Sequence, residues 1–362
     1  MNAMVHLPRG RRAVFLRAEP RIALLGTGVV GSAFVTRCER LRAAGVKVPG
    51  FAWLGNSRAL AEGDSDAATA LAKVRAAPPR DGAWAPWVEA AGLQRGDIVV
   101  DATASDTVAG WHPEWLARGV NVVTANKLGN GGELARAQAI SEAAADTGAL
   151  YGDAATVGAG LPLLRSIREL VAGGDRIHSV EGVLSGSLAW LFDRYDGSRP
   201  FSALVRDARA EGYTEPDPRI DLSGEDVRRK LLILARAAGI ALEADAVAVE
   251  SLVPAVLARA SVDHCDGLLE ALDAPMEARL AAARHAGARL RVVGRIEGGR
   301  AEVGLRALPA VHPLCAGGDT DNVVAIHSCR YSGQPLVIRG PGAGAGVTAA
   351  ALLDEVLAIA RG

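Results

Sequence analysis

The chain has 362 residues, of which 49% are apolar and 22% charged, with a formal net charge of -1. This size and composition indicate a folded protein with room for two domains, and they argue against a disordered chain. The near-neutral charge gives no electrostatic reason to expect nucleic acid or a membrane surface as a partner, and no apolar stretch is long enough to span a membrane.

The cysteines indicate a reducing compartment. Cys38, Cys265, Cys315 and Cys329 are widely separated, with no CxxC pair and no spacing typical of a zinc site. Scattered cysteines of this kind are typical of a reducing cytoplasm, so we expect a cytoplasmic protein.

Residues 1–20 precede the first expected strand and carry four arginines. They lack the apolar core and the small-residue cleavage site of a signal peptide. We therefore expect an N-terminal extension outside the folded domains.

The next segment predicts a strand over 21–25, a helix over 32–44 and a second strand over 46–53. A GxGxxG sequence follows the first strand directly. In such a sequence Gly26 permits the tight turn, Gly28 lets a pyrophosphate approach the backbone, and Gly31 lets the helix pack on the strand. The helix N-terminus supplies N–H donors for the phosphates. The residues expected to hold a dinucleotide are therefore Gly26, Thr27, Gly28, Val29, Val30 and Gly31.

The end of the second strand indicates which cofactor is preferred. NAD sites usually place an acid there for the ribose hydroxyls, whereas NADP sites tend to supply an arginine. This chain has Asn56, Ser57 and Arg58 and no acid. We therefore expect Ser57 and Arg58 to bind a 2′-phosphate and NADP(H) to be preferred over NAD(H). Alternatively, Arg58 is only a surface arginine.

Two further buried strands are predicted over 97–103 and 120–127. Thr103 and Lys127 lie at their carboxyl ends, where a doubly wound sheet presents its ligand crevice. Alternatively, Lys127 is a solvated loop lysine. Residues 62–96 predict irregular surface elements, with helical stretches, that cover the sheet.

After residue 150 helices and strands alternate less regularly, which is typical of an α+β domain. The elements expected there are helices over 163–171, from 188 through 192 and over 347–360, and strands over 178–184, 288–296, 301–308, 322–328 and 335–339. We expect the last helix to dock back on the first domain. The predicted fold class is therefore α/β. A Rossmann-type nucleotide-binding domain over 21–150 is completed by 335–362, and a second α+β domain spans 151–334.

The segment 212–230 is the most distinctive part of the chain. It carries five carboxylates and two stiffening prolines, and it leads into a helix. Ser223 is expected to cap this helix with Asp226 as the capping acid, and Asp226 and Lys230 then share one helical face. Such a segment is suited to bind an ammonium group and to offer a proton donor. Alternatively, it is a solvated turn followed by an ordinary ion pair.

Together these segments resemble the homoserine dehydrogenase family over nearly all of residues 21–362, and most closely the dehydrogenase half of the bifunctional aspartate kinase–homoserine dehydrogenases. The segments that carry the resemblance are 26–31, 126–127, 156–162, 182–187, 212–230 and 340–348. The resemblance implies reduction of L-aspartate 4-semialdehyde to L-homoserine with NADPH or NADH, in threonine, methionine and isoleucine biosynthesis. It also implies a second domain used for catalysis and dimerisation, in a homodimer or higher homo-oligomer.

The resemblance also implies roles for individual residues. Lys230 corresponds to the acid/base lysine and Lys127 to a second active-site lysine that also meets the cofactor. The substrate-binding positions are Glu215, Asp221, Asp226, Gly186 and Ser187, and further cofactor contacts are Thr103 and Gly344. Main-chain carbonyls of Ala154, Val157, Ala159 and Leu161 correspond to a structural Na+ site. The chain departs from the family in having Leu128 in place of a second lysine and Ser187 in place of a common threonine.

Two other functions stay open at this stage. One is another Rossmann oxidoreductase of amino-acid metabolism, such as aspartate semialdehyde dehydrogenase, which needs a cysteine nucleophile. The other is a non-catalytic NADP-binding sensor. Because the last expected helix takes the chain to its end, we expect neither an attached kinase nor a regulatory module for threonine.

Overall fold

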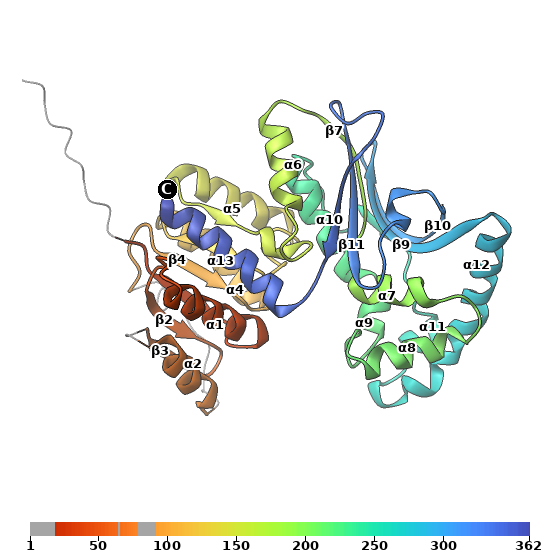
Figure 1. Ribbon diagram of the computed structural model, residues 1–362, viewed down its shortest axis with the longest axis horizontal. Helices are drawn as coiled ribbons and strands as arrows, with labels where there is room; N and C mark the ends of the chain where they lie inside the picture. The colour runs from red at the N-terminus through yellow and green to blue at the C-terminus, as the bar shows by residue number, and fades with distance from the viewer. Residues whose placement is uncertain (1–18, 64–65, 79–91) are drawn as a thin grey trace, which may run out of the picture.

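The computed structural model describes residues 19–63, 66–78 and 92–362, which form two lobes (Figure 1). The extension predicted over 1–20 lies almost entirely outside the described residues, as does 79–91 of the segment predicted to be irregular. Within the described part of the chain no helix is long and apolar enough to cross a membrane.

The first lobe is built on a sheet with the strand order β3-β2-β1-β4-β5-β6 among the described residues. All neighbouring strands are parallel except the edge pair β2–β3. The central strands are buried along their whole length, which is why they read as continuous apolar runs in the sequence. The strands are β1 (Ile22–Leu25), β2 (Phe51–Gly55), β3 (Leu60–Glu62), β4 (Ile98–Asp101), β5 (Asn121–Thr124) and β6 (Tyr151–Gly152).

Helices cover both faces of this sheet. On one face α1 and α13 pack on each other and on the strands, through residues such as Phe34 and Leu352. On the other face α4 and α5 pack through Trp115 and Ile140. The helices are α1 (Val29–Ala43), α2 (Ala67–Ala76), α4 (Asp106–Ala117), α5 (Leu134–Thr147) and α13 (Ala345–Arg361). The last helix of the chain therefore lies in the first lobe.

The second lobe holds a sheet in the order β12-β11-β7-β9-β10-β8, antiparallel except for the β10–β8 pair. Its core includes the apolar face of α10, which packs on β9 and β10. The strands are β7 (Ile177–Val183), β8 (Val247–Val249), β9 (Ala288–Glu297), β10 (Arg300–Pro309), β11 (Asp321–Ser328) and β12 (Leu336–Pro341). The helices are α6 (Leu163–Ala172), α7 (Gly186–Arg194), α8 (Phe201–Ala210), α9 (Arg219–Leu222), α10 (Glu225–Ala237), α11 (Ala255–Ala258) and α12 (Asp273–His285), with 3-10 turns η1 (Ala154–Thr156), η2 (Val262–His264), η3 (Asp266–Leu272) and η4 (Pro313–Cys315).

The two sheets and their helices confirm the predicted α/β class, but several local predictions need correction. The second strand lies at Phe51–Gly55 and not over 46–53, because Pro49 has no N–H to donate to a ladder. In the segment 62–96, α2 agrees with the helical stretches expected there, whereas the strand β3, which ends at Glu62, was not expected. The sequence did not reveal α4, α5, α8 or α12.

The predicted cap of α10 is also wrong. Residues before it already form α9, and the chain turns into α10 at Gly224, whose φ of +80° favours glycine. Ser223 accepts a hydrogen bond from the main-chain N–H of Glu225 at 3.2 Å, and so supports the turn without capping the helix at Asp226.

Helix α13 is attached to the start of the second lobe by Glu355. Its carboxylate accepts the main-chain N–H of Ala154 at 3.2 Å, beside the fully buried Asp153. Arg168 donates two hydrogen bonds of 2.6 and 2.9 Å to Asp153, so the positive charge of Arg168 is paired with Asp153 and not with Glu355. Burial, together with the negative charge of Asp153, raises the pKa of Glu355 to about 8.

We expect this carboxyl group to make stability depend on pH. Its folded pKa lies above its ordinary value of 4.5, so the folded state keeps a proton that the unfolded state has lost. The free energy of unfolding should therefore fall as pH rises from about 4.5 to about 8. Glu355→Gln should flatten this fall, so that the variant exceeds wild type at pH 8 by about 1–2 kcal/mol and matches it at pH 5.

Urea denaturation at both pH values measures the difference. Glu142→Gln, at an exposed position of α5, is the matched control and should leave the profile unchanged. Parallel profiles for wild type and Glu355→Gln would contradict the assignment.

Candidate active site

The glycine-rich turn between β1 and α1 leaves room for a phosphate group. Gly26 has φ +93°, and a Cβ there would lie 2.7 Å from the carbonyl oxygen of Ala102. A Cβ on Gly31 would lie 1.8 Å from the carbonyl oxygen of Gly26, so neither position accepts a larger residue. Gly28 faces open space and precedes the first turn of α1, which has no side-chain cap. The free N–H donors and the open approach fit a dinucleotide pyrophosphate.

A cavity of about 470 Å³ opens beside this turn. Gly26, Gly28 and Thr103 line it, together with Ser57 and the indole of Trp111. Its position at the carboxyl ends of β1, β2 and β4 is the usual place for the nucleotide in a doubly wound sheet.

Two arginines lie near this region. Arg58 is exposed and does not line the cavity; its main-chain N–H donates to the side chain of Asn56 at 2.8 Å. Arg75, at the end of α2, lies closer to the start of α1, with its guanidinium 3.5 Å from the hydroxyl of Ser32. The sequence singled out Arg58 alone, because Arg75 approaches the turn only through folding.

Asp101 fixes the two loops that lead from β4 and β5 toward the cleft. It is fully buried, and its carboxylate accepts hydrogen bonds from the main-chain N–H of Thr103 at 2.8 Å and the amide of Asn126 at 3.0 Å. The ring of His112, also fully buried, lies 2.9 Å from the same carboxylate. Because one carboxylate holds both loops, the position of Lys127, next to Asn126, is set with that of Thr103.

Asp226 lies between two lysines, one from each lobe. Its carboxylate is 2.8 Å from the Nζ of Lys230 and 3.3 Å from the Nζ of Lys127. Lys230 is buried on α10 and also donates to the carbonyl oxygen of Leu184 at 2.7 Å. Burial alone would raise the pKa of Asp226, but the charges of Lys230 and Lys127 outweigh it and hold that pKa well below its usual range.

Among the described residues, no lysine or arginine forms an ion pair with Asp221. Its carboxylate accepts the hydroxyl of Ser187 at 2.7 Å and the main-chain N–H of Glu215 at 2.9 Å. Burial raises the pKa of Asp221 in spite of these hydrogen bonds, and the negative charges of Glu215 and Asp226 add to the effect. A cation bound beside Asp221 would stabilise the charged carboxylate and so lower its pKa again.

Two cavities meet at the lysines. One, of about 890 Å³, lies against the acidic segment and is lined by Gly186, Ser187, Glu215 and Asp221 among others. The second, of about 530 Å³, lies toward the nucleotide-binding turn and is lined by residues that include Val30, Thr103 and Ala159. The residues common to both are Lys127, Asp226, Arg229, Lys230, Ala343 and Gly344. A hydride can pass between a dinucleotide and a second ligand only across such a junction.

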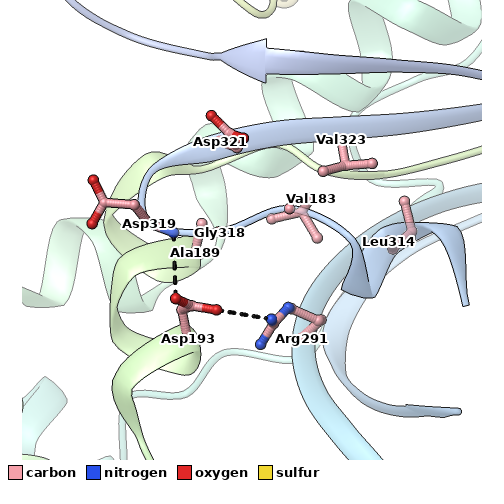
Figure 2. A pocket seen from close by; sticks show the side chains of 10 residues that line it. Val183, Ala189, Asp193, Arg291, Leu314, Gly318, Asp319, Asp321 and Val323 are labelled. Atoms are coloured by element: carbon pink, nitrogen blue, oxygen red, sulfur yellow. Dashed lines mark hydrogen bonds and ion pairs between the residues drawn. The ribbon is translucent and has the colours of Figure 1, made fainter. Parts of the chain in front are cut away.

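The wall of the larger cavity includes Thr320, at the end of a loop that Asp193 anchors. Figure 2 shows Asp193, on α7, between the guanidinium of Arg291 and the backbone of Asp319. The cavity beside them, of about 10 Å³, has room for about one water molecule, so we assign this group to support of the loop.

The loop expected to hold Na+ has carbonyl groups that suit a cation. Val157 and Ala159 are buried, and among the described residues no N–H or hydroxyl donates to their main-chain oxygens. Ala159 has φ +50°, which is unusual for a residue with a side chain. The carbonyl oxygen of Leu161 accepts the N–H of Leu163 at 2.8 Å and is already partnered. The loop therefore fits a monovalent cation at Val157 and Ala159 better than at Leu161.

Not every predicted site residue reaches a cavity. Thr27 is buried, and its hydroxyl accepts a hydrogen bond from the side-chain amide of Asn56 at 2.8 Å. Its side chain therefore stabilises the turn and does not face the cavity. Val29 is 78% exposed, on the outer side of α1. Arg58 does not line a cavity of the site either, and the same is true of Gly31, Ala154, Val157 and Leu161.

The sequence missed three kinds of residue at the site. Arg229 adjoins Lys230, yet nothing in a helical pattern separates it from its surface neighbour Arg228. Thr320 and Ala343 come from distant loops. No sequence pattern indicated that Asp101 and His112 contact each other, because this contact forms only when β4 and α4 pack together.

A glycine-rich turn at a strand end, opening on a cleft with two lysines, defines a nicotinamide-dependent oxidoreductase of Rossmann type. Residues 162–357 match the family model described as homoserine dehydrogenase, and residues 26–151 match the model described as homoserine dehydrogenase, NAD binding domain. The chain belongs to the homoserine dehydrogenase family.

Individual relatives agree with this assignment. The chain is 35% identical to a homoserine dehydrogenase of Paracoccidioides brasiliensis, over 93% of this chain and 97% of that one. It is 46% identical to bifunctional aspartokinase/homoserine dehydrogenase 2 of Escherichia coli, over 73% of this chain and 33% of that one, so it spans about a third of the length of that relative. A solved Candida auris protein of unknown function is 34% identical with a TM-score of 0.83, over 94% of this chain and 98% of that one.

Proposed function

We propose that the protein catalyses the NAD(P)H-dependent reduction of L-aspartate 4-semialdehyde to L-homoserine, and the reverse oxidation. The observation that carries this proposal is the junction of the two cavities, where Lys127, Asp226 and Lys230 face both a nucleotide-binding turn and an acidic pocket. Family membership and the cited relatives support it.

In this reaction Lys230 is the proton donor. NAD(P)H supplies a hydride to the aldehyde carbon, and the oxygen that gains negative charge needs a proton. The Nζ of Lys230 is buried and held by Asp226 and by the carbonyl of Leu184, so its N–H bonds have fixed directions. Lys127 adds a second positive charge beside the same oxygen.

The acidic pocket accounts for an amino-acid substrate. Asp221 is half-buried and forms no ion pair with a cationic side chain of the described residues, and the main-chain N–H of Glu215 donates to it. An ammonium group there would offset the cost of keeping the Asp221 carboxylate charged. Gly186 and Ser187 line the same cavity and position that carboxylate.

Aspartate semialdehyde dehydrogenase chemistry is less well supported. It needs a cysteine nucleophile, and among the described residues no cysteine lines either cavity. A sensor without activity does not require a proton donor, so it does not explain why Lys230 is held between Asp226 and the carbonyl of Leu184 at the cavity junction.

The proposal predicts oxidation of L-homoserine by the purified protein. We expect cofactor reduction, followed at the absorbance of the reduced nicotinamide, to depend on both L-homoserine and NAD(P)+. A rate equal to that of a buffer control with either cofactor, for protein shown to be folded by circular dichroism, would refute the proposed function.

Lys230→Ala should lower kcat by roughly 10²–10⁴-fold, because a general acid contributes about that much. Binding of NADP+, measured by quenching of tryptophan fluorescence, should stay near the wild-type value. Lys73→Ala, at an exposed position of α2, is the control and should keep wild-type activity. A Lys230→Ala enzyme with more than half of the wild-type kcat would remove Lys230 from the mechanism.

We also propose that NADP(H) is preferred over NAD(H), because Asn56, Ser57 and Arg58 follow β2 without an acid. Arg58→Ala should reduce the ratio of kcat/KM for NADP to that for NAD by about tenfold, the loss of one charge-assisted hydrogen bond. Arg75→Ala, measured in parallel, separates the contributions of the two arginines. An equal or higher kcat/KM with NAD in the wild type would contradict the preference.

Further features belong to the same proposal. Val157 and Ala159, with Ala154 and Leu161 nearby, are proposed to hold a structural Na+ through main-chain carbonyls. We propose residues 21–150 and 335–362 as the nucleotide-binding domain, 151–334 as the catalytic and dimerisation domain, and a homodimer or higher homo-oligomer. The four free cysteines support a cytoplasmic enzyme, and the substrate places it in threonine, methionine and isoleucine biosynthesis.

A further inference from the structure

Arg229 lies at the junction of the two cavities and has no role in the mechanism described above. Like Lys127 and Asp226, it lines both the acidic cavity and the nucleotide-side cavity. Its side chain is half-buried, and its main chain is part of α10, directly before Lys230. The cleft therefore holds a third cation at the point where the reacting groups must meet.

The other cations of the larger cavity already have carboxylate partners. Lys127 and Lys230 share Asp226, at 3.3 and 2.8 Å. Arg219 also lines this cavity, but its guanidinium pairs with Asp217 at 2.6 Å and donates to the carbonyl oxygen of Ala260 at 2.6 Å. Within the described part of the chain, Arg229 makes no ion pair and no side-chain hydrogen bond. Its guanidinium is the cation of this cleft that remains available to a bound anion.

We propose that Arg229 binds the α-carboxylate of the amino-acid substrate and so determines the preference for an amino acid over a simple amino alcohol. This inference rests on the proposed function and adds to it a residue that recognises the substrate. Glu215 and Asp221 attract the ammonium group and repel a carboxylate.

The chemistry of the substrate explains why the partner is Arg229. In homoserine the carboxylate and the ammonium group are attached to one carbon, so both lie close to the acidic wall. The carboxylate must turn away from Asp221 toward a cation that is not already neutralised. Both lysines share Asp226, and Arg229 lies on the same wall of α10. A planar guanidinium can also give two parallel hydrogen bonds to a carboxylate, which a lysine cannot.

The test compares two substrates that differ only in the carboxylate. L-Homoserine carries it, and 3-aminopropan-1-ol lacks it but keeps the ammonium and hydroxyl groups. Steady-state kinetics are measured for wild type, Arg229→Gln and Arg229→Lys with both compounds. 3-Aminopropan-1-ol is also measured as a competitive inhibitor in case its turnover is too slow to follow. Arg228→Gln is the matched control, because Arg228 lies one residue earlier, pairs with Glu225 and lines neither cavity.

We expect Arg229→Gln to lower kcat/KM for L-homoserine by roughly 10–100-fold, mainly through KM, the loss of one charge-assisted contact. The constants for 3-aminopropan-1-ol and the KM for NADP+ should stay within about twofold of wild type. Arg229→Lys should recover part of the loss. Arg228→Gln should behave as wild type.

Three results would overturn the assignment. Unchanged kinetics with L-homoserine would show that Arg229 makes no productive contact. An equal loss of kcat/KM with both compounds would show that Arg229 contacts the ammonium or hydroxyl group that they share, or that it only stabilises the fold. A change confined to the KM for NADP+ would assign it to a cofactor phosphate. Calorimetric titration of the NADP+ complex with L-homoserine separates this proposal from the function itself: no binding by wild type refutes both, whereas equal binding by wild type and Arg229→Gln refutes only the Arg229 contact.

Discussion

The carboxylate of Asp226 is the group on which the cleft depends, because it binds a lysine from each lobe at once. Lys127 comes from the loop after β5, and Lys230 comes from the next turn of α10. Without that carboxylate two ammonium groups would face each other in a half-buried site, which is costly. One acid therefore both joins the lobes electrostatically and keeps the positive charges at the point where an oxygen would become negative.

The opposite pKa shifts of Asp221 and Asp226 give the cleft its polarity. Burial raises the pKa of both, but only Asp226 has lysine charges close enough to reverse the effect. The charge of Asp226 is thus offset by two lysines, whereas Asp221 has no cationic partner among the described residues. Neighbouring groups whose environments separate their pKa values in this way are typical of catalytic sites. In the proposed reaction the ammonium end turns to Asp221 and the aldehyde end to Lys230.

Sequence reasoning predicted the parts of this site that local rules govern. The glycine turn, the buried strands and the Asp226–Lys230 pair all follow from short-range sterics or helical spacing. The contact of Lys127 with Asp226 depends on how two lobes pack, and no spacing encodes it. The start of α10 was misplaced because Gly224 and the short α9 compete with Ser223 as a helix boundary. Arg229 was missed because a sequence pattern cannot show which of several helix cations forms no ion pair with the other described residues.

The path of the chain explains why the cleft lies where it does. The chain crosses from the first lobe to the second between β6 and α6, and it returns between β12 and α13. Both crossings line the nucleotide-side cavity, the first with Ala155, Thr156 and Ala159 and the second with residues 342–344. A Cβ on Gly342 would lie 2.0 Å from the side chain of Asn322, so the return crossing must pass close to β11. Glu355 then binds the first crossing at Ala154, so that the two covalent connections support each other beside the site and limit how far the lobes can separate there.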